Sequence, residues 1–128
     1  MFTVQGMPRS GTTLLAQCLN AHPALVVPDE TDFMVPAAHA FCLIDAPEVG
    51  RRYLADLVTA TARFEVTLGR WLTPERVAAE IAEAPYRFDA LIASLYEALA
   101  DEAGAALAGD KSPNDLAQSE ILGNAGFF

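Results

Sequence analysis

Two glycines and the polar residues around them form the stretch best suited to chemistry. Gly6 and Gly11 bracket four residues, which is the spacing of a phosphate-binding P-loop. An apolar run precedes the loop and a helical pattern follows it, so backbone N–H groups and the helix N-terminus would point at one anion. Arg9 lies inside the loop and offers a planar, permanently charged guanidinium. The alternative is an exposed loop arginine between two ordinary turn glycines.

The loop differs from that of a nucleotide triphosphatase at one position. Thr12 stands where the lysine that contacts the β- and γ-phosphates is expected, and Thr13 follows it. Binding of a magnesium triphosphate is therefore disfavoured. The hydroxyls of Ser10, Thr12 and Thr13, together with the loop guanidinium, instead suit a 5′-phosphate or a phosphosulfate.

These residues carry a family resemblance. The segments GMPRSGTTLL at 6–15 and NAHP at 20–23 resemble the 5′-phosphosulfate loop and first helix of sulfotransferases, which use 3′-phosphoadenosine 5′-phosphosulfate. The branch they resemble contains the tyrosylprotein sulfotransferases and many bacterial sulfotransferase-like proteins. PDET at 28–31 and GDKSP at 109–113 fit the same family in the same order. The resemblance implies transfer of a sulfuryl group to a hydroxyl or amine acceptor, with no required metal.

The resemblance also implies two catalytic residues. Glu30 corresponds to the general base of the tyrosylprotein sulfotransferases, and sulfuryl transfer to a hydroxyl needs a base near the acceptor proton. Lys111, the only lysine, corresponds to the cation that neutralises charge on the bridging oxygen or the transferred group. The alternatives are a solvated loop acid, with Asp29 and Asp32 as chemically equal neighbours, and a surface lysine paired with Asp110.

The histidines and cysteines receive structural interpretations. His22 is expected to close the first helix, and His39 to be packed or partly exposed in an apolar run, although other sulfotransferase branches use a histidine base. Cys18 falls on the apolar face of the first helix and is expected to pack in the core. Cys18 and Cys42 give neither a zinc spacing nor a disulfide framework.

A parallel sheet and its helices must position these residues. Short strands are predicted at 2–5 and 24–27, with a helix over 11–21 between them. A third strand at 105–109 would place Asp110 and Lys111 at its carboxyl end. Further helices are predicted at 37–44, at 48–64 with Arg63 mostly on the outer side, at 86–103 and at 112–122. Another is expected to begin at Thr73-Pro74, with Thr73 as its N-cap. The helix at 86–103 has an apolar stripe and is expected to end at Gly104; the stripe consists of Phe88, Leu91, Ile92, Leu95 and Leu99.

The predicted fold is α/β, with a P-loop-like partial parallel sheet of about three strands flanked by helices and truncated before the later strands. Residues 1–128 are expected to be the amino-terminal part of a single sulfotransferase-like domain. A further strand is expected to begin at 127–128, and the family's residues for the 3′-phosphate would lie on it and beyond. Two other functions stay open: a P-loop kinase-like phosphotransferase, and a catalytically dead fragment that binds anions.

The amino-acid composition limits the class of protein to which this chain can belong. The chain has 128 residues, a net charge of −9 and 52% hydrophobic residues, which favours one folded domain and argues against non-specific nucleic-acid or membrane binding. The loop's field acts over about one Debye length, roughly 8–10 Å, so the net charge does not exclude an anionic co-substrate. We expect a cytoplasmic protein whose partner is a small-molecule or peptide acceptor.

Overall fold

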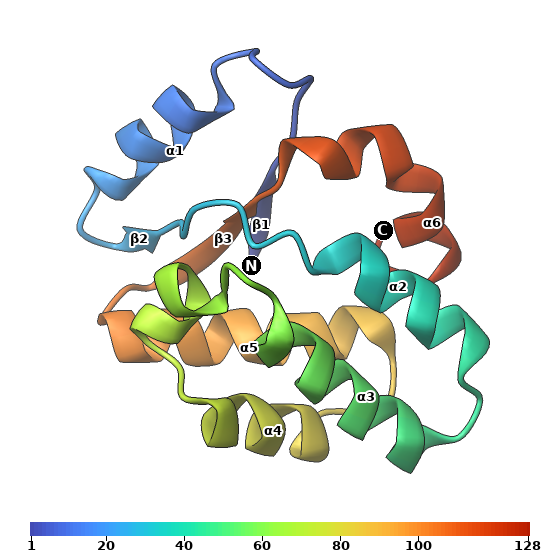
Figure 1. The fold of residues 1–128 in the computed structure, drawn as a ribbon. Coiled ribbons are helices and arrows are strands. Elements are labelled where there is room, and N and C mark those ends of the chain that lie inside the picture. The colour runs from blue at the N-terminus through green and yellow to red at the C-terminus, as the bar shows by residue number, and fades with distance from the viewer.

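The structure is a computed structural model that describes residues 1–128, except for the side chain of Asn114. Three short strands, six α-helices and three 3-10 turns follow one another along the chain (Figure 1). In chain order they are β1 (Phe2–Val4), α1 (Thr12–Asn20), β2 (Leu25–Val26), α2 (Met34–Leu43), α3 (Pro47–Ala60), η1 (Phe64–Val66), η2 (Leu68–Arg70), α4 (Pro74–Glu83), α5 (Phe88–Ala103), β3 (Leu107–Lys111), η3 (Pro113–Gln118) and α6 (Ser119–Asn124).

The strands form one parallel sheet in the order β1-β3-β2. Phe2 lies opposite Gly109 and Leu25 lies opposite Leu107. A Cβ on Gly109 would come within 2.4 Å of the Phe2 ring, so glycine lets that ring lie on the middle strand. β3, the last strand in the sequence, is therefore the central strand. Its carboxyl end lies between the loops that follow β1 and β2. The predicted parallel α/β class is confirmed.

Helices cover both faces of the sheet. Figure 1 shows α1 on one side and α5 on the other, with α4 and α3 packed beyond α5. The predicted stripe on α5 is buried because its residues recur at helical spacing and face the sheet and α4. Gly104, with φ of 66°, ends that helix as expected. Thr73 caps α4 by accepting a hydrogen bond of 3.2 Å from the Arg76 N–H, also as predicted.

The core lies between the sheet and helices α2 to α5. Its most completely buried side chains come from the five helices α2 to α6, from the residue before α2 and from the turns between α3 and α4. They are Phe33, Met34, Val58, Leu68, Leu72, Val77, Ile81, Phe88, Leu91, Ile92, Leu95, Tyr96, Leu99 and Leu122.

Two predictions at the carboxyl-terminal side are wrong. The third strand is Leu107–Lys111, two residues later than predicted, so Asp110 and Lys111 lie within the strand. Asn124 ends α6, residues 125–126 form a turn, and residues 127–128 do not form a strand. Gly126, with φ of 81°, redirects the chain, and the Phe127 ring packs 6.0 Å from the Phe88 ring in a T-shaped pair. Phe127 is partly buried by this aromatic contact with α5.

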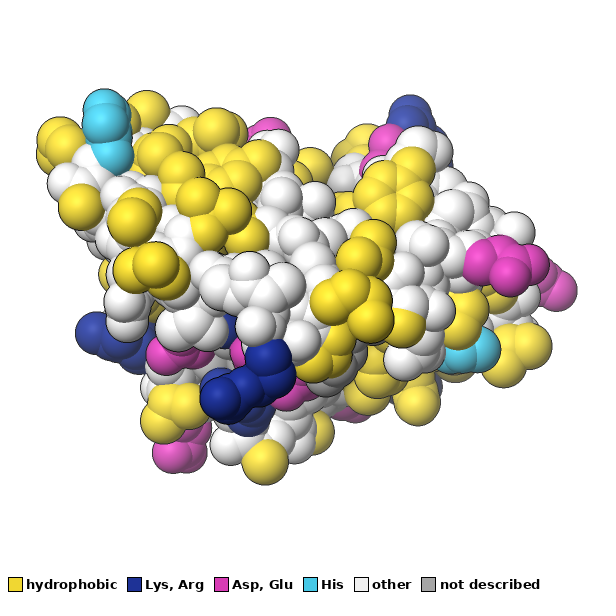
Figure 2. All heavy atoms as spheres, turned by 90° about the horizontal axis from the view of Figure 1, so that it is seen from above, with side chains coloured by type: hydrophobic (Ala, Val, Ile, Leu, Met, Phe, Trp, Pro, Cys, Tyr) yellow, Lys and Arg dark blue, Asp and Glu magenta, His cyan; other side chains and the backbone are white. Residues whose placement is uncertain are grey.

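The prediction that Cys18 packs in the core is also wrong. Cys18 is exposed, as are Leu14 and Leu15 at 66% and 51%. Figure 2 shows hydrophobic side chains gathered on the side of the molecule where α1 lies. The helix meets the short sheet through the small residues Thr12 and Ala16, and no other described element covers its opposite face.

Candidate functional site

The loop between β1 and α1 folds back on its own start. Arg9 has φ of 66° and Gly11 has φ of 90°, so both adopt the left-handed conformation. The Ser10 N–H donates to the Met7 carbonyl at 3.1 Å and closes a turn. A Cβ on Gly6 would lie 2.7 Å from the Ser10 Oγ and 2.9 Å from the Thr12 Cγ2. Glycine at position 6 allows this close approach of the Ser10 and Thr12 side chains, and the sequence spacing anticipated a glycine-bounded loop here.

This loop presents an uncapped helix end to a cavity. No described side chain caps α1, and its first turn contains no acidic residue. The first N–H groups of the helix and its dipole are therefore directed toward the loop. The cavity next to the loop has a volume of about 660 Å³. Its lining residues are Pro8, Arg9, Gly11, Thr12, Thr13, Leu14, Gln17, Glu30 and Pro113.

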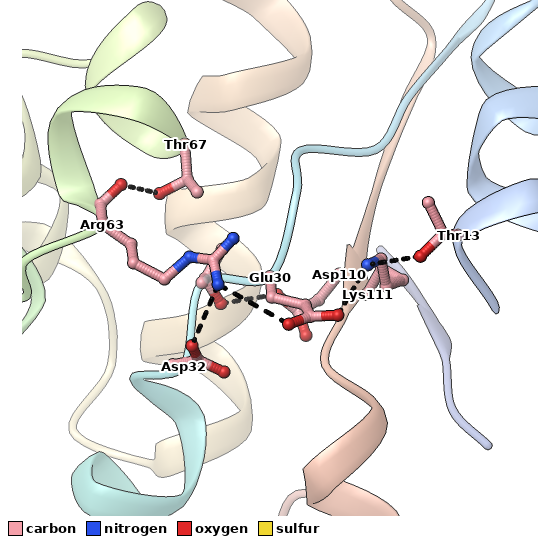
Figure 3. Close-up of polar contacts among 8 residues, drawn as sticks. Thr13, Glu30, Asp32, Arg63, Thr67, Asp110 and Lys111 are labelled. Carbon is pink, nitrogen blue, oxygen red and sulfur yellow. Dashed lines mark hydrogen bonds and ion pairs between the residues drawn. The ribbon is translucent and has the colours of Figure 1, made fainter. Parts of the chain in front are cut away.

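Lys111 is the last residue of β3, and its side chain extends to the end of the loop between β1 and α1. Its side chain is 3% exposed, and its Nζ donates to Glu30 Oε1 at 2.8 Å and to Thr13 Oγ1 at 3.3 Å (Figure 3). The interpretation as a surface lysine paired with Asp110 is therefore wrong. The three motifs, far apart in the sequence, meet at one ammonium group. This happens because β3 lies between β1 and β2 in the sheet.

Glu30 has a second cationic neighbour. Its Oε2 lies 3.6 Å from an Arg63 nitrogen, and the same nitrogen lies 3.7 Å from the Asp32 carboxylate (Figure 3). Thr67 donates to the Arg63 carbonyl at 2.8 Å and holds this turn after α3 in place. No motif or spacing in the sequence indicates Arg63, which falls within the helix predicted at 48–64 and was expected on its outer side. Asp29 is exposed and has no hydrogen bond or ion pair with a described side chain, so it is not part of this cluster.

A buried network supports both candidate catalytic residues. Asp110 accepts hydrogen bonds from Thr31 Oγ1 at 2.8 Å and from the Tyr96 hydroxyl. Burial raises the pKa of Asp110, although these hydrogen bonds favour its ionised form. Burial and the neighbouring Asp110 raise the pKa of Tyr96 well above its usual value. Because Thr31 follows Glu30 and Asp110 precedes Lys111, this network fixes the backbone on both sides of the Glu30–Lys111 pair.

The sequence profile of the Sulfotransferase family matches residues 2–125, which include the loop, Glu30 and Lys111. The chain belongs to the sulfotransferase family. No curated protein and no solved structure matches it. Membership in this family identifies a transferase type whose general reaction is sulfuryl transfer.

Neither histidine of this sulfotransferase-family chain joins the cluster. His22 lies in an exposed turn after α1, where its Nδ1 accepts a hydrogen bond of 3.2 Å from the Ala24 N–H. His39 is exposed on α2 and has no hydrogen bond with Glu30 or Lys111. Among the described side chains, no group of three or more His, Cys, Asp or Glu residues could hold a metal ion. In the same part of the chain, no helix is long and apolar enough to cross a bilayer.

Proposed function

We propose that this chain transfers a sulfuryl group from 3′-phosphoadenosine 5′-phosphosulfate to a hydroxyl or amine acceptor. One observation carries the proposal. The Lys111 ammonium contacts both the anion loop, at Thr13, and the carboxylate of Glu30. A donor site, a cation and a base for sulfuryl transfer would thus lie within one group of touching side chains.

The loop supplies the donor site. We assign the 5′-phosphosulfate to the backbone N–H groups of Arg9 and residues 11–13 and to the Arg9 guanidinium, which lines the cavity without a described partner. Gly6 and Gly11 permit the loop's curvature, and the hydroxyls of residues 10, 12 and 13 add donors. A triphosphatase would place its lysine at position 12, where this chain has the buried Thr12. The cation instead comes from β3.

Glu30 and Lys111 divide the chemistry. The acceptor oxygen or nitrogen forms a bond to sulfur, and the bond from sulfur to the bridging phosphate oxygen breaks. The acceptor proton passes to Glu30, and 3′-phosphoadenosine 5′-phosphate leaves with the bonding electrons. As Glu30 takes up the proton, it attracts the Lys111 ammonium less strongly. That ammonium then becomes available to the negative charge on the bridging oxygen.

Ligand preference tests the proposal. In calorimetry, 3′-phosphoadenosine 5′-phosphate should bind more tightly than ATP, and EDTA should not weaken it. Arg9→Ala should weaken this binding by about 1.5–3 kcal/mol, the range for hydrogen bonds to charged groups. The control is Arg52→Ala, which removes an exposed arginine of α3 and should leave the affinity unchanged. Tighter, magnesium-dependent binding of ATP would instead identify a kinase-like phosphotransferase.

A further inference from the structure

A second cavity lies on the other side of the Glu30 loop, between that loop, α2 and η3. Its volume is about 480 Å³. Its lining residues are Asp32, Val35, Pro36, His39, Asp115 and Gln118. Two carboxylates face this cavity and no lysine or arginine lines it, whereas Arg9 lines the cavity at the anion loop. The two cavities therefore differ in charge.

Asp115 is the unusual member of this second cavity. It is only 5% exposed, and its carboxylate has no hydrogen bond or ion pair with any side chain that the structure describes. Burial raises the pKa of Asp115 to about 7, and the charges of Asp110 and Asp32 act in the same direction. Ionising a carboxylate that is so little exposed and has no cationic partner costs free energy, and a bound cation would offset that cost.

The second cavity borders the proposed transfer site along two segments. Glu30 lines the first cavity and Asp32 the second, and both carboxylates lie within 4 Å of one Arg63 nitrogen. At the start of η3, Pro113 lines the first cavity and Asp115 the second. Glu30 therefore lies between the anion-binding cavity and the acidic cavity.

We propose that the acidic cavity binds a protonated amine of the acceptor, so that the acceptor is a small amino alcohol or diamine. Its ammonium group would lie against Asp115 and Asp32, and its second polar group would reach Glu30 across the shared wall. This inference rests on the proposed function, because it names the acceptor for the same reaction. With this arrangement of charges, the anionic donor would bind on one side of Glu30 and the cationic acceptor on the other.

The test uses binding alone, with no sulfuryl donor present. The probe is 5-aminopentan-1-ol, and the uncharged comparison is pentane-1,5-diol. In an NMR titration, the amine should shift the backbone amides of residues 33–35, 37–39 and 115–118 saturably, and the diol should not. Asp115→Asn should weaken amine binding at least tenfold. The matched control, Asp56→Asn, removes an exposed carboxylate on α3 and should leave the affinity unchanged.

The pH dependence adds a second readout. Amine binding should strengthen from pH 6 to pH 8, because Asp115 ionises over this range while the amine stays protonated. The other titratable groups facing Asp115 are Asp110, Asp32 and His39, and Arg63 pairs with Asp32. Asp32→Asn is a second variant that should fold, since Asn tolerates the φ of 57° at that position.

Equal binding of the diol, unchanged binding by Asp115→Asn, or an equal loss with Asp56→Asn would overturn the inference. Failure here is distinguishable from failure of the proposed function. If 3′-phosphoadenosine 5′-phosphate binds and the amine does not, only the acceptor class is wrong. If the amine binds as described and the nucleotide does not, the cation site stands and the proposed donor is wrong.

Discussion

Glu30→Gln should destabilise the folded chain more than Lys111→Met, although both variants break the same ion pair. The difference comes from burial, since the Lys111 side chain is 3% exposed and that of Glu30 is 30% exposed. Without the Glu30 charge, the buried ammonium keeps only the Thr13 hydroxyl at 3.3 Å and a neutral amide. Without Lys111, the Glu30 carboxylate still has water and the Arg63 guanidinium at 3.6 Å.

The magnitudes follow from the two environments. Removing one partner of a fully buried pair costs about 3–5 kcal/mol. The partial exposure of Glu30, and the amide oxygen that still accepts from Lys111, lower this to about 2–3 kcal/mol for Glu30→Gln. Lys111→Met keeps the apolar stem packed and should cost about 1 kcal/mol or less. For a chain of this size, 1 kcal/mol corresponds to a change in Tm of roughly 3–5 °C.

Urea denaturation followed by circular dichroism measures both free energies of unfolding. The double variant should be more stable than Glu30→Gln alone, because it contains no unpaired buried cation. Arg87→Met is the control: it breaks the ion pair with Asp89, in which the Arg87 side chain is 72% exposed, and should change stability by about 0.5 kcal/mol or less. Equal losses in the two single variants, or strictly additive losses in the double variant, would refute the reasoning from burial.

Two further predictions concern the acids of the two cavities. The unfolded chain releases the Asp115 proton near pH 4 and the folded chain near pH 7, so the folded state binds more protons between these values and stability falls as pH rises through this window. Asp115→Asn should reduce this fall between urea titrations at pH 5 and pH 8, leaving the part due to the raised pKa of Asp110, and an unchanged slope would contradict it. In turnover assays with a sulfuryl donor, Glu30→Gln should lower kcat by about 10²–10⁴-fold with little effect on donor affinity. Asp29→Asn removes an exposed neighbouring carboxylate and should be nearly neutral, so equal losses in both variants would exclude Glu30 as the base.

Local signals predicted much of this fold. The Gly6–Gly11 spacing predicted the loop, the Thr73 cap predicted the start of α4, and the apolar stripe predicted α5. Each of these features depends on residues a few positions apart, where propensity and periodicity act directly. The same kind of reasoning failed for Cys18, because an apolar helix face is buried only if another element covers it.

Contacts between segments that are far apart in the sequence were harder to predict from it. The meeting of Glu30 with Lys111 followed from a family resemblance, and the sheet order gives its physical basis. Arg63 reaches Glu30 from a turn after α3, and no periodicity or spacing in the sequence indicates that contact. Tyr96 did carry a signal, since it lies four residues after Ile92 on the buried stripe of α5. A buried tyrosine there needs a partner for its hydroxyl, and Asp110 is that partner.

The position of the single lysine connects these observations. A lysine at position 12 would belong to the loop itself and would move with it. At position 111 the lysine ends the central strand, where Asp110 is held by Thr31 and Tyr96 and the ammonium is held by Glu30 and Thr13. A cation fixed in this way needs no reorganisation when negative charge develops nearby, which is the condition for strong electrostatic stabilisation. The same strand end leads directly to Asp115, so one short segment supplies charge to both cavities, positive toward the anion loop and negative toward α2.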